Sequence, residues 1–147
     1  MHITFAIGRV LLVLIFILSG AMKLLDIQGT TAMIAPVVTI PDALSGFATQ
    51  IEDATGMKVP QLLAILAGVV ELGAGLLVAF NIATRAAAAV LVLFVLVTTF
   101  YFHAFWDMSG ELMQNNMIHA LKNLSIIGGL LTYVVLGSWR PMPSKQV

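Results

Sequence analysis

Glu71 is an acidic residue in the middle of a long apolar stretch of the sequence. A charge at membrane depth costs about 2.5–3.5 kcal/mol, so it needs a partner or a function. Its neighbours on one helical face are small: Ala64, Ala67, Gly68, Ala74 and Gly75. Such a face lets another helix approach closely, so we expect Glu71 to point at protein. Depth along the helices places Arg9 and Lys122 within reach; a guanidinium binds a carboxylate bidentately, so we predict a buried Arg9–Glu71 ion pair.

A second group of polar residues lies near the ends of two later apolar stretches. Its members are His103, Asp107, His119, Lys122 and Asn123. On continuous helices His103 and Asp107 share one face, and His119 and Lys122 share another. We predict that the first four converge on one pocket that opens outward, with Asn123 beside them as a further binding candidate. The donors and the neighbouring aromatic rings suit the carbonyl oxygens and the ring of a quinone; hydrated interfacial charges are the alternative.

Several kinds of chemistry are excluded or disfavoured by what the sequence lacks. The chain has no cysteine, which excludes disulfides, thiolate catalysis and CxxC redox chemistry. Imidazole and carboxylate groups can bind zinc or iron, but the HxxxH and ExxH spacings are absent, so we expect no metal site. Phosphate-binding glycine motifs are also absent. Any redox role must therefore come from a bound cofactor or a partner, and we do not expect the chain to be catalytic alone.

The composition requires lipid around the chain. Of the 147 residues 60% are hydrophobic and only 10% are charged, against about 25% charged in a soluble domain. The zero net charge offers no basic face to a nucleic acid. Four stretches are long enough to cross a bilayer, at 5–25, 60–80, 86–106 and 117–136. We predict one all-α domain over residues 1–147, an integral membrane four-helix bundle; the first stretch also resembles a secretory signal, but we expect it to remain as a span.

The connection between the first two spans, residues 27–59, is too polar to cross the membrane. Leu44, Phe47 and Ile51 recur in it at helical spacing, which predicts an amphipathic helix over about 41–54. We expect this helix on the outer membrane interface or over the end of the bundle, with Thr39 and Asp42 as a capping box. The segments on the opposite side carry only basic charges: Arg9, Arg85, Arg140 and Lys145. The positive-inside rule then places both termini in the cytoplasm.

Four sequence segments in order resemble one known family. They are GRVLLVLIFILSGAMKLLD, VELGAGLLVAFNIATRAAAAVL, FYFHAFWD and QNNMIHALKNLSIIGGLL. With them the chain resembles the DoxX family of small bacterial membrane proteins, whose name comes from subunits of a thiosulfate:quinone oxidoreductase. The resemblance implies a four-helix protein of the bacterial inner membrane that is linked to quinones or to redox partners. The residues it marks as functional candidates are Arg9, Lys23, Glu71, Arg85, His103, His119, Lys122 and Asn123.

Three functions remain open at this point. The leading hypothesis is an accessory subunit of a redox complex, which contacts quinone or anchors a soluble oxidoreductase or another membrane subunit. A small proton-coupled transporter is the second, because Glu71 lies at mid-depth. A purely structural assembly factor, with each buried charge in a static pair, is the third; a homo-oligomer is compatible with all three.

Overall fold

The structure is a computed structural model that describes residues 2–137, and they form helices joined by short connections. In chain order these are α1 (His2–Leu25), α2 (Ile27–Ile34), α3 (Asp42–Thr55), α4 (Val59–Ala79), α5 (Thr84–Phe102), the 3-10 helix η1 (Phe105–Asp107) and α6 (Gly110–Leu136). Four of them, α1, α4, α5 and α6, are long and apolar enough to cross a membrane. No strand occurs within this range. The predicted all-α membrane bundle is confirmed.

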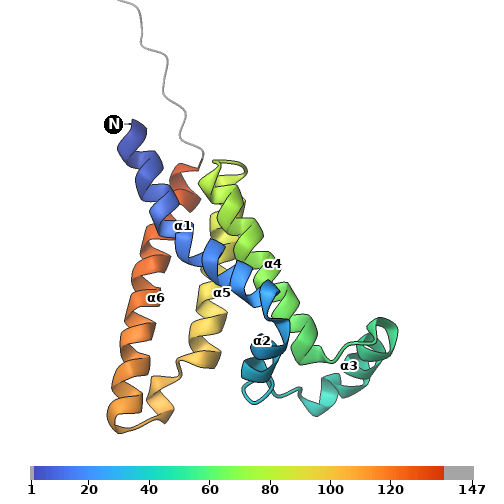
Figure 1. Cartoon of the computed structure of the whole chain (residues 1–147). Helices are drawn as coiled ribbons and strands as arrows, with labels where there is room; N and C mark the ends of the chain where they lie inside the picture. The colour runs from blue at the N-terminus through green and yellow to red at the C-terminus, as the bar shows by residue number, and fades with distance from the viewer. Residues whose placement is uncertain (1, 138–147) are drawn as a thin grey trace, which may run out of the picture.

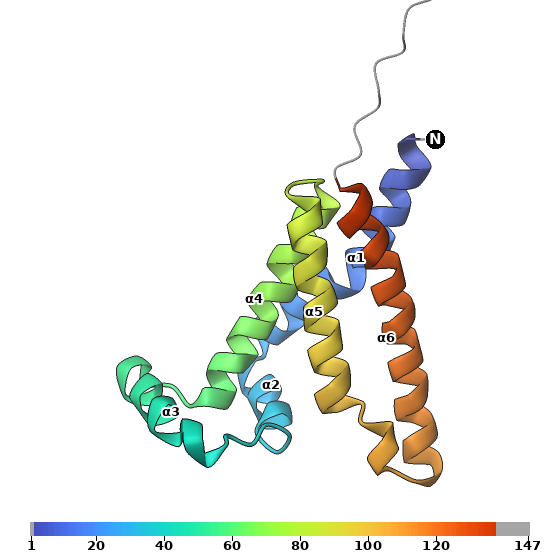
Figure 2. The same cartoon turned by 180° about the vertical axis from the view of Figure 1, so that it is seen from behind.

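The four spans pack mainly as two pairs, α1 along α4 and α5 along α6, and α4 also contacts α5 (Figures 1 and 2). At the end where α1 begins and α6 finishes, the Phe5 and Tyr133 rings lie 5.3 Å apart, and Arg85 donates to the Val135 carbonyl at 2.9 Å. Toward the opposite end α1 leans along α4 and away from α6 (Figure 1). That opposite end, which carries α2, α3 and η1, is called the loop end below. The bundle therefore opens toward the loop end.

The small residues around Glu71 form the contact between α4 and α1, as predicted. Ala64, Gly68, Glu71, Ala74 and Gly75 are all buried. A methyl group placed on Gly20 of α1 would lie 2.5 Å from the Leu72 backbone nitrogen and 2.8 Å from the Gly68 carbonyl oxygen. Only a glycine fits there, because these neighbours are backbone atoms of the facing helix.

The third span ends earlier than predicted, and the fourth begins earlier. The stretch 86–106 is not one helix, because α5 ends at Phe102 and His103 takes non-helical angles (φ −128°, ψ 42°). The following turn, η1, brings the Trp106 ring to 5.7 Å from the Phe100 ring, a packing that a continuing helix would not allow. The span predicted from residue 117 begins at Gly110, because a helix extends through polar residues as readily as through apolar ones.

The amphipathic helix expected in the long connection is present as α3, which has no buried residue and, among the helices that the structure describes, packs against α4 alone. The capping box is wrong: the N-cap residue is Pro41, and no side chain caps the helix. The ring of Pro41 fixes its φ angle at −59°, and with ψ at 145° the residue has the non-helical conformation of an N-cap without a side-chain hydrogen bond. Which side of the membrane α3 occupies rests on the charge distribution alone, and Arg140 and Lys145 lie outside the described residues.

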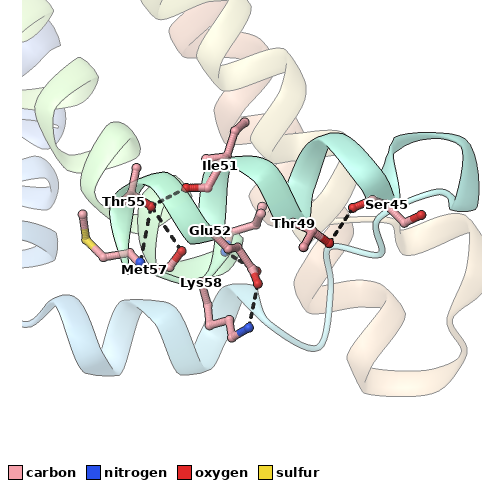
Figure 3. Close-up of polar contacts among 8 residues, drawn as sticks. Ser45, Thr49, Ile51, Glu52, Thr55, Met57 and Lys58 are labelled. Carbon is pink, nitrogen blue, oxygen red and sulfur yellow. Dashed lines mark hydrogen bonds and ion pairs between the residues drawn. The ribbon is translucent and has the colours of Figure 1, made fainter.

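The turn from α3 to α4 is held by Glu52 (Figure 3). Its carboxylate accepts hydrogen bonds from the Lys58 ammonium at 2.6 Å and from the Val59 backbone N–H at 3.0 Å. Both hydrogen bonds lower the pKa of Glu52 below its ordinary value of 4.5, and the bond from Lys58 has the larger effect. The same carboxylate raises the pKa of Lys58 above 10.5. The ionised pair therefore stabilises this turn across the neutral range.

We expect this turn to open on acidification. Because the pKa of Glu52 is lower in the folded state, its contribution is present above pH 4.5 and is lost as the pH falls through the lowered value. Hydrogen exchange of the Val59 amide, corrected for the intrinsic rate, should show falling protection over that interval. The effect is small because the pair is exposed to solvent. Glu52→Gln is the control and should show no acid step; a wild-type profile without a step would contradict the assignment.

Candidate functional site

A cavity of about 430 Å³ lies between the spans where the bundle opens toward the loop end. Residues of α1, α2, α4, α5 and α6, with His103 just after α5, line it. Its polar lining residues are Ser19, Lys23, Thr30, Glu71, Thr98, His103, His119 and Asn123. The remaining walls are apolar and include the rings of Phe16, Phe94 and Phe102. The cavity thus collects polar groups from helices that are distant in sequence.

The acid at the bottom of this cavity is paired with Lys23 of α1. The Lys23 Nζ lies 2.8 Å from Glu71 Oε2 and also donates a short hydrogen bond to the Ser19 hydroxyl, one turn earlier on α1. The Glu71 side chain is 7% exposed and that of Lys23 is 25% exposed. Lys23 and Glu71 therefore form a largely buried ion pair that faces the cavity, and the Ser19 hydroxyl is hydrogen-bonded to its ammonium.

The predicted Arg9–Glu71 pair is wrong. The close contact of α1 with α4 is centred on Gly20, which places the next turn of α1, with Lys23, beside Glu71. Arg9 lies three turns before Gly20, near Tyr133 of α6, where its buried Nε atom has no hydrogen-bond partner among residues 2–137. Depth along straight helices brought Arg9 within reach of Glu71, but the tilt of α1 moves its two ends toward different neighbours.

Two histidines form the other polar wall of the cavity. The rings of His103 and His119 stack with centroids 4.9 Å apart and planes within 10°. Asn116 donates its Nδ2 to the Leu112 carbonyl at 3.0 Å, so its Oδ1 faces His103 Nδ1, also at 3.0 Å. An amide oxygen accepts, so Nδ1 of His103 carries the proton. The Nε2 atom of a neutral His103 is then an acceptor and donates only when the ring is protonated.

Asn123 completes this wall from α6. Its Nδ2 donates to the Thr99 hydroxyl of α5 at 2.9 Å, and the residue lines the cavity. Because Asn123 lies one helical turn after His119, the same face of α6 presents both residues. The bond to Thr99 fixes the amide against α5 and holds the two helices in register.

Comparison with known proteins identifies the family of this chain. The sequence model of the DoxX family matches residues 4–104. The chain belongs to the DoxX family. This DoxX protein is 32% identical to the inner membrane protein YphA of Escherichia coli K12 over 131 residues. The aligned segment covers 89% of this chain and 81% of YphA. No solved structure matches it. This DoxX chain is thus a multi-pass integral protein of the inner membrane.

Of the four residues predicted to converge on one pocket two do so, and the further binding candidate Asn123 joins them. His103, His119 and Asn123 line the cavity of this DoxX protein. Asp107 lies in η1 and is exposed, because α5 ends before it and it cannot share a helical face with His103. Lys122 is exposed on α6 and does not line the cavity, because it is one residue before Asn123 and so points about 100° away from it.

Sequence reasoning from spacing missed Lys23, Ser19 and Asn116. Lys23 was marked only by the DoxX resemblance; its position four residues after Ser19 is the signal that could have shown that both share one face of α1. Asn116 was placed in a connection and not on a helix, so its contact with His103 could not be predicted. Within residues 2–137, no group of three or more histidine, aspartate and glutamate residues is arranged to hold a metal ion.

Proposed function

We propose that this DoxX protein is a quinone-linked accessory subunit of an inner-membrane redox complex, and that the cavity receives the quinone ring. One observation supports it most: a ring-sized cavity in the spans brings the Lys23–Glu71 pair and the His103–His119 pair together between apolar walls. Its volume of about 430 Å³ falls within the range of about 300–1,000 Å³ for small-ligand sites. Apolar walls with a few converging polar groups are typical of such sites.

The polar groups suit the two carbonyl oxygens of a quinone. An ammonium has three donors, and two of those of Lys23 go to Ser19 and Glu71. The third remains for a ligand carbonyl. At the other wall, His103 donates its Nδ1 proton in a hydrogen bond to Asn116, so it can donate to a ligand only through a protonated Nε2. Phe94 and Phe102 offer aromatic surface to the quinone ring.

The role proposed is accessory because the chain has no cysteine to carry thiol redox chemistry. Electrons would be exchanged between the quinone and a partner oxidoreductase, and this chain would hold and orient the ring. The competing function is a structural subunit in which the Lys23–Glu71 pair only joins α1 to α4. Saturable quinone binding in the cavity separates the two functions.

We expect the cavity to bind a quinone saturably, with one carbonyl oxygen at Lys23 and the other at the histidine wall. The titratable groups that line the cavity are Lys23, Glu71, His103 and His119, and Glu71 neutralises Lys23. A hydrogen bond contributes about 0.5–1.5 kcal/mol net, so loss of one polar partner of the quinone should weaken binding about two- to tenfold. Binding would be measured with a short-chain benzoquinone on the protein in lipid nanodiscs.

His103→Ala and His119→Ala should each weaken binding about two- to tenfold, the first by removing a polar group of the cavity and the second by removing the stacked ring. Lys122→Ala is the matched control and should behave as the wild type, because Lys122 is exposed outside the cavity. Absence of saturable binding would rule out the quinone function. Wild-type affinity in both histidine variants would remove histidine from the mechanism.

A further inference from the structure

A second hollow, of about 370 Å³, lies between α4 and α5 beneath α2. Figure 2 shows α2 at the loop end, between the ends of α4 and α5. The walls of this hollow are apolar except for Thr98 and Tyr101. Its lipid-facing edges are Leu66 on α4 and Val97 on α5, each with 57% of its surface exposed. We call this hollow the α4–α5 groove.

The groove is adjacent to the polar cavity and shares a wall with it. Five residues line both: Ile34, Ala67, Phe94, Thr98 and Phe102. Two of them, Ala67 and Thr98, are small and come from the two facing helices. The shared wall is therefore thinnest at these two side chains, where a chain from the cavity would enter the groove.

A third hollow borders the cavity on the opposite side, between α1 and α2. It shares Ser19 and Lys23 with the cavity and also includes Asp26. Charged groups at this opening disfavour a hydrocarbon chain, because a chain lying there would keep them from water and from each other. Of the two side openings, only the α4–α5 groove has walls that match a hydrocarbon.

We propose that the α4–α5 groove holds the isoprenoid tail of the quinone whose ring occupies the polar cavity. This inference rests on the proposed function and adds to it the position of the isoprenoid tail. The groove runs from Tyr101 at the loop end to Val70 and Phe94 near the middle of their helices, so the tail points toward the membrane interior. Lipid tails are as apolar as the groove, so the gain comes from van der Waals packing and is moderate.

The test compares two ligands with the same benzoquinone ring, one without a tail and one with a short isoprenoid tail. Each is bound to the protein in lipid nanodiscs, and the amount taken up by empty nanodiscs is subtracted, which removes simple partition into lipid. We expect the wild type to bind the tailed compound about tenfold more tightly. Val97→Trp and Leu66→Trp fill the groove from its two walls and should abolish this preference while the tailless compound binds as before.

Leu93→Trp is the matched control, since Leu93 lies one turn before Val97 on α5, is equally lipid-exposed and lines none of these hollows. It should keep the wild-type preference. Leu18→Trp fills the hollow beside α1; loss of the preference in that variant alone would place the tail there and overturn the assignment.

The remaining outcomes distinguish a failure of the groove assignment from a failure of the quinone site. Equal binding of both compounds by the wild type, or a preference that survives both groove variants, overturns the groove and leaves the quinone site intact. If neither compound binds, the proposed function and the groove are overturned together. Native mass spectrometry that finds a phospholipid lost from Val97→Trp, with no tail preference in the wild type, assigns the groove to lipid and overturns the quinone tail.

Discussion

Lys23→Met lowers the stability of the protein by about 3–5 kcal/mol, because it leaves the Glu71 carboxylate buried without its partner charge. Glu71→Gln is expected to cost less. The Lys23 side chain is 25% exposed against 7% for Glu71, so an unpaired ammonium can reach water more easily than an unpaired carboxylate. The order of the two losses follows from which charge is more deeply buried.

The double variant Lys23→Met/Glu71→Gln should recover part of the larger loss, because no uncompensated charge remains. Apparent melting temperatures in a mild detergent measure all three variants, and the double-mutant cycle isolates the coupling. Ser19→Ala removes only a neutral partner of Lys23 and should cost about 1 kcal/mol. Lys122→Met, at an exposed lysine of α6, is the control for loss of a positive charge. Strictly additive losses at positions 23 and 71 would contradict the pair.

The sequence predicts which residues share a helical face, but it does not predict how two helices are tilted against each other. The face of α4 that carries Glu71 follows from helical periodicity alone, and its small residues proved to be the contact with α1. The partner of Glu71 depends on how α1 is tilted against α4. That tilt is set by the fit of Gly20 against Gly68, which a single sequence does not reveal. The same reasoning that placed Glu71 correctly therefore chose Arg9 over Lys122 and did not consider Lys23, the observed partner.

The histidine wall shows the second limit. His103 and His119 were expected in one pocket because their helices are joined by a short connection, and the two rings do stack. Asp107 was added by assuming that α5 continues through residue 106, but the chain turns at His103. Aromatic residues after Phe102 keep the stretch apolar, so hydropathy gives no sign of the turn. The length of an apolar stretch predicts a span well and predicts its last residue poorly.

The close contact between α1 and α4 leads to a second large effect. Gly20→Ala adds a methyl group 2.5 Å from the Leu72 nitrogen and 2.8 Å from the Gly68 carbonyl oxygen, and backbone atoms cannot rotate away. The two helices must separate, which weakens the packing that holds Lys23 beside Glu71. Overpacking of this kind costs about 1–3 kcal/mol, and the loss of ion-pair geometry adds to it.

Three glycines provide a graded series for this prediction, measured as melting temperature in detergent. Gly68→Ala would meet the Leu24 side chain at 2.7 Å, which can change rotamer, and the Gly20 carbonyl oxygen at 3.2 Å. This backbone contact is longer than the 2.5 and 2.8 Å contacts of Gly20→Ala, so the loss should be smaller. Gly73 has no atom within 4 Å of the added methyl group, so Gly73→Ala should leave stability unchanged or raise it. Because Gly20 sets the register of α1 on α4, Gly20→Ala should also reduce the coupling between Lys23 and Glu71 in the double-mutant cycle. A full coupling in the Gly20→Ala background, or equal melting temperatures for all three variants, would show that this contact does not position the ion pair.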